Sequence, residues 1–180
     1  VDLSKENFEN HSFNKYNTSV NGTEVPNNWK TATNNTNTSY VNSGIISADN
    51  SLIAGINPSL SGNENYLYIS SLSDTYFGYT SATSYTFESE KYYKISINVL
   101  TRYLNQEDKK DDINYGASIK LADSSEIMLC GIDTEGVWRT YTIYASFTTS
   151  LTSKITLALG YVDEATAGEV LFDNLTIETI

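Results

Sequence analysis

The sequence predicts a single all-β domain, a β-sandwich or jelly roll, and three observations support this prediction. Apolar and polar residues alternate with a period of two in one segment after another, whereas helical periodicity is nearly absent. Clusters of Gly, Asn, Asp and Ser separate these segments at short intervals. The length of 180 residues is usual for one sandwich or barrel. We therefore expect residues 1–180 to form one module.

In chain order, residues 27–50 contain few large aliphatic side chains and many Asn, Thr and Ser, which predicts long loops with short strands. The clearest predicted strand is Tyr92–Arg102. Its expected inward side chains are Tyr93, Ile95, Ile97 and Val99, and its expected outward side chains are Lys94, Ser96, Asn98 and Arg102. One face of this strand should be buried and the other exposed to water.

After a charged segment at residues 106–112, which must be solvated, three further segments alternate in the same way. The expected inward side chains are Ala117, Ile119 and Leu121, then Tyr141, Ile143 and Phe147, then Ile155, Leu157, Leu159 and Tyr161. Tyr144 falls on the outward face of its segment. Each strand with this pattern has one apolar face that can pack in a core, which is what a sandwich of two sheets requires.

The charge balance limits the classes of partner. Asp and Glu number 22 and Lys and Arg 11, which gives a formal net charge of −11. Nucleic acid and anionic membrane surfaces would be repelled, and no apolar run approaches the roughly 20 residues that insertion into a membrane requires. The Tyr-, Ser-, Thr- and Asn-rich surface favours an extracellular or cell-surface location, in a bacterium. Because the chain begins at Val1, we expect neighbouring domains of a longer secreted or surface protein.

Catalytic motifs are missing from the sequence. His11 is the only histidine, and there is no Gly-x-Ser-x-Gly elbow, no His-x-x-Glu-His metal helix and no glycine-rich phosphate loop. Two acids could still form a glycosidase dyad, but with 22 acidic residues some pair will always look suitable. We therefore expect a module that is not an enzyme by itself. The single cysteine, Cys130, excludes an intramolecular disulfide and is expected to be a small buried side chain.

Short motifs along nearly the whole chain occur in a recognisable order. They are Asn7-Phe8-Glu9, Val25-Pro26-Asn27-Asn28-Trp29, Tyr66-Leu67-Tyr68-Ile69, Tyr92-Tyr93-Lys94-Ile95, Gly136-Val137-Trp138-Arg139-Thr140-Tyr141 and Gly168-Glu169-Val170-Leu171-Phe172-Asp173-Asn174-Leu175. In these motifs the chain resembles the carbohydrate-binding-module type of β-jelly roll, in the galactose-binding-domain-like group. The resemblance implies that Trp29 and Trp138 are mainly packing residues.

The resemblance also implies a structural calcium ion near the termini. Its side-chain ligands would be Glu9 and Asp173, with backbone carbonyls completing a shell of six to eight oxygens. Two carboxylates brought together at adjoining strands repel each other unless a cation or a proton lies between them. The sequence departs from the usual start of the family, because Lys5 stands where Asn would fall and Glu6 where Gly is common. The alternative is that both acids are ordinary exposed residues at strand ends.

Outward aromatic side chains are the candidates for a ligand site. Sugar rings stack on Tyr or Trp through their C–H faces, and their hydroxyls bond to planar polar groups. If Leu67 and Ile69 point inward, Tyr68 points outward by alternation. The alternative is the aromatic segment at residues 74–79, a loop or edge strand whose rings could line a rim. The candidate ligand-binding residues are therefore Tyr68, Tyr76, Tyr79, Asn98, Arg102 and Tyr144. We expect a glycan or polysaccharide as partner, and the alternative is a structural or adhesive spacer of a bacterial surface protein that has no sugar site.

Overall fold

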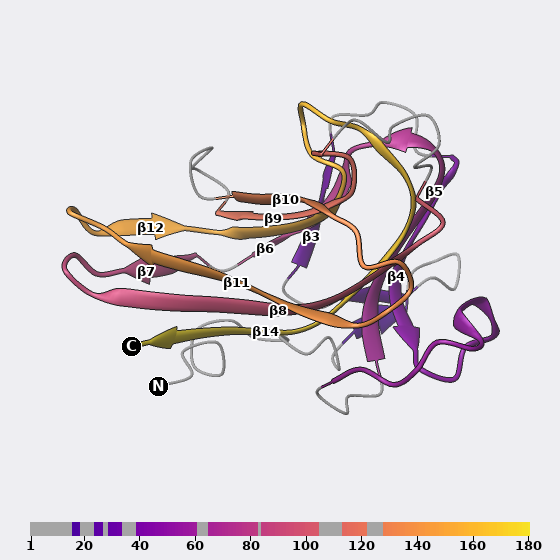
Figure 1. Cartoon of the computed structure of the whole chain (residues 1–180), viewed down its shortest axis with the longest axis horizontal. Coiled ribbons are helices and arrows are strands. Elements are labelled where there is room, and N and C mark those ends of the chain that lie inside the picture. Colours follow the sequence, from indigo (N-terminus) through magenta and orange to yellow (C-terminus); the bar gives the residue numbers. More distant parts are fainter. Residues whose placement is uncertain are drawn as a thin grey trace.

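The computed structural model describes residues 16–18, 24–26, 29–33, 39–60, 65–82, 84–104, 113–121 and 128–180. The described part is a β-sandwich in two layers, as the alternation predicts (Figure 1). Its elements are β1 (Tyr16–Thr18), β2 (Glu24–Pro26), β3 (Trp29–Thr33), β4 (Val41–Ser47), the 3₁₀ turn η1 (Ser51–Ile53), β5 (Asn65–Thr75), β6 (Phe77–Ser81), β7 (Tyr85–Phe87), β8 (Tyr92–Arg102), β9 (Ala117–Leu121), β10 (Met128–Ile132), β11 (Arg139–Ser146), β12 (Leu151–Ser153), β13 (Ile155–Leu159) and β14 (Thr166–Thr179).

Two antiparallel sheets form the layers. The long-strand sheet has the order β11-β8-β14-β5-β4, and the short-strand sheet has the order β10-β9-β13-β6-β3. Two pairs of short strands, β1-β2 and β12-β7, accompany them. Among the described strands of the long-strand and short-strand sheets, only β4-β5 and β9-β10 are neighbours both in the sheet and in the sequence, so most of the topology could not be derived from local patterns. No helix among the described residues has the length and hydropathy of a membrane span.

The core lies between the two sheets, and it is built from the side chains that the alternation predicts. Ile95, Ile97 and Val99 on β8, with Ile119 on β9 and Leu157 on β13, are all at most 1% exposed. Removing this much apolar surface from water is the main source of stability for a domain without disulfides. The strand predictions at Tyr92–Arg102 and at residues 117–121 are therefore confirmed, and the predicted strand at residues 140–147 is present as Arg139–Ser146, which leaves Phe147 just outside it.

Three local expectations differ from the structure. β13 ends at Leu159 rather than at Tyr161, because Gly160 adopts a φ of +71° and Tyr161 then forms only an isolated bridge with Glu164. Within residues 27–50, β4 is a full strand of seven residues that buries Ile45 and Ile46. Cys130 on β10 is half-buried rather than buried. The charged segment at residues 106–112 lies outside the described residues.

A second apolar cluster lies on the outer face of the long-strand sheet, which is the face turned away from the short-strand sheet. It comprises Ile46, Ile53, Tyr66, Tyr68, Leu100, Trp138 and Leu171. The indole of Trp138 packs against Tyr66 with ring centroids 5.0 Å apart, and its Nε1 donates to the Asn57 carbonyl at 2.9 Å. Segment 50–59 therefore covers one end of this outer face.

The motif at residues 168–175 on β14 supports both clusters. Val170 and Phe172 point into the core, whereas Leu171 belongs to the outer cluster. The register shifts between Asp173 and Thr176, and Asn174 has a φ of +55°, so the bulge returns Leu175 to the core side. At Gly168, with a φ of +132°, a Cβ would lie 2.7 Å from Leu104 Cδ2 and 2.9 Å from the Tyr103 carbonyl oxygen. Glycine is therefore required where the chain after β8 crosses β14.

Candidate functional site

Four of the six expected ligand residues lie on one sheet. Tyr68 on β5, Asn98 and Arg102 on β8, and Tyr144 on β11 belong to the long-strand sheet. All four side chains lie on its outer face, because they alternate with the core residues of their strands. Tyr76 and Tyr79 belong to the region of β6 in the other sheet. The six residues therefore do not form one site.

The prediction that the Tyr79 ring is exposed is wrong, because the ring lies between the two sheets. Phe77 and Tyr79 both point into the core, and Tyr79 is 4% exposed with its hydroxyl 2.8 Å from the Ser43 hydroxyl. Tyr76, between β5 and β6, is half-buried. Burial raises the pKa of both tyrosines above the ordinary value. Neither ring forms part of an exposed aromatic platform.

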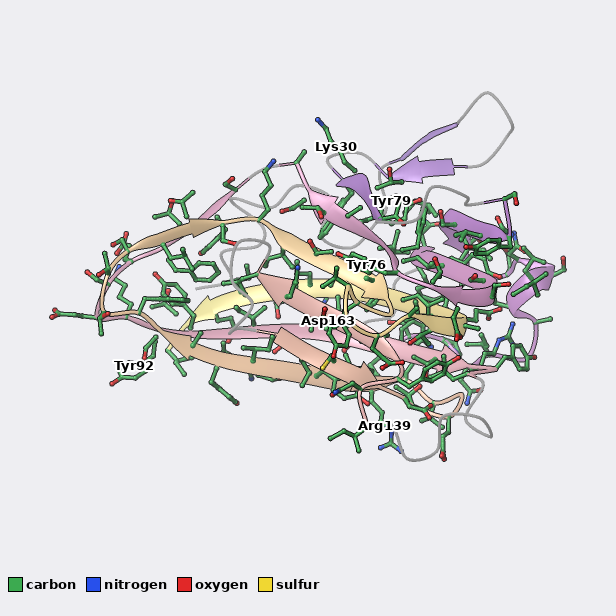
Figure 2. The ribbon with its side chains drawn as sticks, turned by 90° about the horizontal axis from the view of Figure 1, so that it is seen from above. Lys30, Tyr76, Tyr79, Tyr92, Arg139 and Asp163 are labelled. Carbon is green, nitrogen blue, oxygen red and sulfur yellow. The ribbon has the colours of Figure 1, made fainter. Side chains whose placement is uncertain are left out.

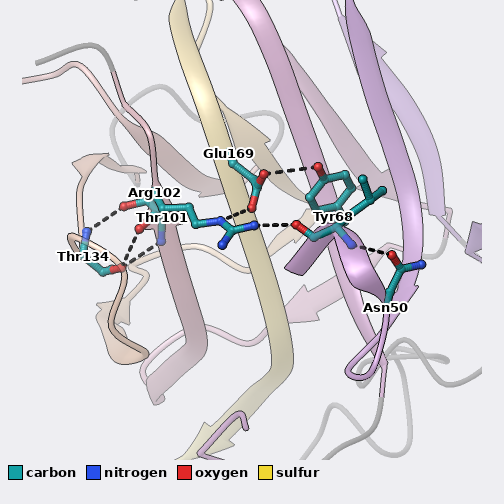
Figure 3. A network of polar contacts seen from close by, with 7 residues as sticks. Asn50, Tyr68, Thr101, Arg102, Thr134 and Glu169 are labelled. Atoms are coloured by element: carbon teal, nitrogen blue, oxygen red, sulfur yellow. Dashed lines mark hydrogen bonds and ion pairs between the residues drawn. The ribbon is translucent and has the colours of Figure 1, made fainter. Parts of the chain in front are cut away.

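Tyr68 points outward, as expected, but segment 50–59 covers it, so that it is 6% exposed. Its hydroxyl donates to Glu169 Oε2 at 3.2 Å, and Arg102 Nε donates to Glu169 Oε1 at 2.5 Å (Figure 3). Burial, the largest of several effects, raises the pKa of Tyr68, so the hydroxyl stays protonated and serves as a donor. Tyr68 supports Glu169 in this structure and has no ring face open to a ligand.

Arg102 connects this network to segment 50–59. Its Nη2 donates to the Leu52 carbonyl at 2.6 Å, and Asn50 Oδ1 accepts from the Leu52 amide at 2.9 Å (Figure 3). The guanidinium carbon also lies 4.7 Å from the centroid of the Tyr103 ring. This distance is typical of a cation–π contact. Arg102 is thus a structural residue that also holds one face of the adjacent tyrosine.

A small open pocket lies beside this arginine, at the end of β8. It is lined by Arg102, Tyr103, Leu104, Asp133, Glu135 and Gly136, which we call the corner site, and its volume is about 240 Å³. Pockets that enclose a drug-sized ligand usually measure about 300–1,000 Å³. The corner site therefore has room for about one ring of a larger ligand.

Tyr103 supplies the aromatic ring of the corner site. The side chain is 74% exposed, and the guanidinium of Arg102 covers one ring face, so the opposite face is open to solvent. Its φ is +59°, in the left-handed region that bulky residues rarely adopt. Such a conformation costs of order 1–3 kcal/mol, and such residues cluster at binding and catalytic sites. Because the ring is 74% exposed, its contact with Arg102 offsets only part of this cost.

The opposite wall of the corner site is a hydrogen-bonded turn that joins β10 to β11. The Thr101 amide donates to Thr134 Oγ1 at 2.8 Å, and the Thr134 amide donates to Thr101 Oγ1 at 2.7 Å. Asp133 Oδ1 accepts from the Glu135 amide at 3.1 Å and from Thr101 Oγ1 at 3.2 Å, so this carboxylate shapes the turn. Glu135, at a φ of +51°, is exposed at the rim.

The remaining expected residues lie farther along the same face. Asn98 is 8% exposed, and its Oδ1 accepts from Thr140 Oγ1 at 2.7 Å. Tyr144 is 67% exposed beside Tyr92 on the neighbouring strand, which is 64% exposed and points away from the sandwich in Figure 2. Tyr144 lies opposite Lys94, eight residues from Arg102, which corresponds to about 26 Å along β8. One sugar ring could not contact both ends.

Of the two expected calcium ligands, the structure describes only Asp173. Asp173 is fully buried on the outer face, where its Oδ2 accepts a hydrogen bond from Ser59 Oγ. Glu9 lies outside the described residues. Within the part of the chain that the structure describes, no three His, Cys, Asp or Glu side chains gather in a way that could hold a metal ion. The described residues thus supply one carboxylate of the expected pair.

Sequence reasoning identified Arg102 but missed Tyr103, Asp133 and Glu135. Tyr103 follows the last residue of the alternating strand, and its left-handed backbone has no signature in a sequence. The Asp133-Thr134-Glu135-Gly136 turn does have one, since Asp at the start and Gly at the end of four residues are typical of a turn. Its position beside the end of β8 depends on tertiary contacts.

No family model matches the sequence, and no curated protein is similar to it. Several solved structures do share its fold. A cyclase from Fischerella sp. TAU, in complex with 4-(1H-indol-3-yl)butan-2-one, has a TM-score of 0.67 at 14% identity, over 96% of this chain and 95% of that one. The K1 cleaved adhesin domain of Lys-gingipain from Porphyromonas gingivalis W83 has a TM-score of 0.54 at 10% identity, over 94% and 96%.

The third similar structure is the module TmCBM61 in complex with β-1,4-galactotriose. Its TM-score is 0.51 at 10% identity, over 97% of this chain and 99% of that one. At these identities the likeness concerns the fold, which the three proteins combine with different activities. The long-strand and short-strand sheets of this chain therefore form a β-sandwich with the jelly-roll fold of carbohydrate-binding modules.

Proposed function

We propose that this chain is a non-catalytic carbohydrate-binding module whose glycan site is the corner site. The observation that carries the proposal is Tyr103, an exposed ring in an unfavourable backbone conformation, beside a pocket of about 240 Å³. A sugar ring would stack on the open face of Tyr103, and its hydroxyls would bond to Glu135 and the turn at residues 133–136. We further propose that the module acts outside the cell, within a longer bacterial protein.

The charges around the corner site favour a neutral or amino sugar over an acidic one. Asp133 and Glu135 are both carboxylates, and Arg102 is already paired with Glu169. A uronic acid or a sulfated sugar would bring a further negative charge to a chain with a net charge of −11. We therefore expect neutral oligosaccharides to bind more tightly than acidic ones of equal length.

The outer face also offers no glycosidase dyad from its two buried acids. Glu169 and Asp173 lie four residues apart on β14, which places their Cα atoms about 13 Å from each other. A glycosidase dyad needs two carboxyl groups that flank one sugar bond and are free to exchange protons with it. Both acids are also occupied, by Arg102 and Tyr68 in one case and by Ser59 in the other. These observations support binding without catalysis.

Replacing Tyr103 by asparagine is expected to abolish glycan binding while the fold is kept. The ring is 74% exposed, so its removal leaves no cavity, and asparagine tolerates a φ of +59° better than tyrosine does. Tyr103→Phe keeps the stacking surface and should bind at close to the original affinity. The measurement is a glycan array of plant, host and microbial glycans, followed by calorimetric titration of the retained oligosaccharides.

An array that stays silent across all three sources would contradict the proposal and favour a spacer module. The middle of the outer face supports that alternative, because it is lined by hydroxyl side chains such as the Ser96–Thr142 pair, 3.1 Å apart. A single corner site should bind weakly, since a shallow wet site recovers only part of its contact energy after desolvation. Several copies on one surface would raise the avidity.

The family resemblance leads us to propose a structural calcium ion as well, held by Glu9 and Asp173. Chelation is then expected to lower the melting temperature by several degrees, and added Ca²⁺ should restore it. Glu9→Ala and Asp173→Ala should both abolish this sensitivity to chelator. Glu9→Ala is the clearer test, because Asp173→Ala also removes the acceptor of the Ser59 hydroxyl. If chelator leaves the melting temperature of the original chain unchanged, the calcium proposal is wrong.

A further inference from the structure

Strand β11 forms one edge of the long-strand sheet, and among the residues that the structure describes no strand pairs with its outer edge. Its eight residues pair with β8 from Arg139 to Ser146 in an unbroken register. Prolines, charged residues and bulges normally prevent edge strands from pairing with other chains. Between Thr140 and Ser146, strand β11 has none of these three features. The edge strand β10 of the other sheet, in contrast, has a bulge between Leu129 and Ile132.

Both faces of β11 leave apolar surface partly exposed. Tyr141 and Ile143 point toward the core, yet both are only half-buried, whereas their partners Ile95 and Ile97 on β8 are at most 1% exposed. On the outer face, Tyr144 is 67% exposed. A strand added beside β11 would therefore cover apolar side chains on both faces and pair the unpaired backbone groups of the edge.

We propose that β11 pairs with β11 of a second copy of this chain, in antiparallel orientation around a two-fold axis. Such an axis, perpendicular to the sheet, keeps like faces together, so that the inward Tyr141 and Ile143 of one copy meet those of the other. Two registers satisfy this condition and keep most of the strand paired: one places Thr142 opposite itself, and the other places Ile143 opposite itself. A second copy thus matches both faces of β11 at once.

The distribution of charge is compatible with a second copy at this edge and at few other places on the surface. With a net charge of −11, two copies repel each other over most of their surface. The edge of β11 is uncharged from Thr140 to Ser146, and its one charged residue, Arg139, lies at the start of the strand. Antiparallel pairing places the two Arg139 side chains at opposite ends of the interface, where they do not face each other.

Sedimentation equilibrium of the whole chain tests this proposal. We expect a reversible dimer of twice 20.0 kDa, and Thr142→Lys should raise its dissociation constant about tenfold, because the two-fold axis applies each new charge twice. The matched control is Thr31→Lys, at an exposed position on the edge strand β3 of the other sheet, which should leave the dimer intact. Melting curves of both variants verify that the fold is kept.

Cysteine cross-linking then identifies the strand that pairs. Thr142→Cys and Ile143→Cys are made separately with Cys130 replaced by serine, since Cys130 is the only cysteine. One of the two places its sulfur opposite its own copy, at a separation that a disulfide can span, and should form a covalent dimer on mild oxidation. A chain that stays monomeric at every concentration, or a dimer that neither cysteine cross-links, would overturn the proposal.

Discussion

Replacing Glu169 by alanine is expected to lower the free energy of unfolding by about 3–5 kcal/mol. The carboxylate is 7% exposed and pairs with Arg102, whose side chain is 16% exposed, so the variant leaves a largely buried guanidinium without its anion. The Tyr68 hydroxyl loses its acceptor in the same step. A buried charge that lacks its partner costs more than the pair contributes.

Urea unfolding measures this loss. Glu169→Gln keeps a polar acceptor and should lose less free energy of unfolding than Glu169→Ala. The double variant Glu169→Ala with Arg102→Ala should be more stable than Glu169→Ala alone, because it no longer buries an unpaired charge. Glu178→Ala, farther along β14 and half-exposed, is the matched control and should change the free energy of unfolding by about 0.5 kcal/mol or less. Equal losses at Glu169 and Glu178 would show that the buried pair does not hold segment 50–59 on the sheet.

Replacing Trp138 by alanine is expected to cost about 3–5 kcal/mol, the usual range for a buried tryptophan. The side chain is 6% exposed, packs on Tyr66 and donates to the Asn57 carbonyl, so one substitution removes apolar packing and a hydrogen bond. Val137→Ala, at the exposed neighbouring position, should have little effect. Denaturant midpoints of the two variants that agree within error would contradict the role of the outer cluster.

The sandwich core could be predicted well from the sequence, because alternate residues of a half-buried strand point to its buried and its exposed face. Ile95, Ile97 and Val99 are core residues for that reason, and Lys94 and Ser96 face outward. Alternation also predicted the direction of Tyr68 correctly. It could not predict that Tyr68 is covered, because the cover comes from Ile53 and Trp138, which reach it through tertiary contacts.

The candidate site was harder to predict than the core, for two physical reasons. The aromatic run at Tyr76, Phe77 and Tyr79 suggested an exposed rim, but Gly78 packs against Ala158 so closely that a Cβ would lie 2.6 Å from Ala158 Cβ, and its neighbours turn inward. Tyr103, in contrast, depends on a left-handed backbone and on a turn that lies 30 residues later in the chain. Such a site is determined by the tertiary fold, whereas the core is determined by local alternation.

The most direct test of glycan binding at the corner site is a map of amide chemical shifts during titration with a neutral oligosaccharide that the array retains. We expect the changes to cluster at residues 102–104 and 133–136 and to be lost in Tyr103→Asn. Changes confined to Tyr92, Lys94 and Tyr144, about 26 Å along β8 from Arg102, would contradict the assignment of the site.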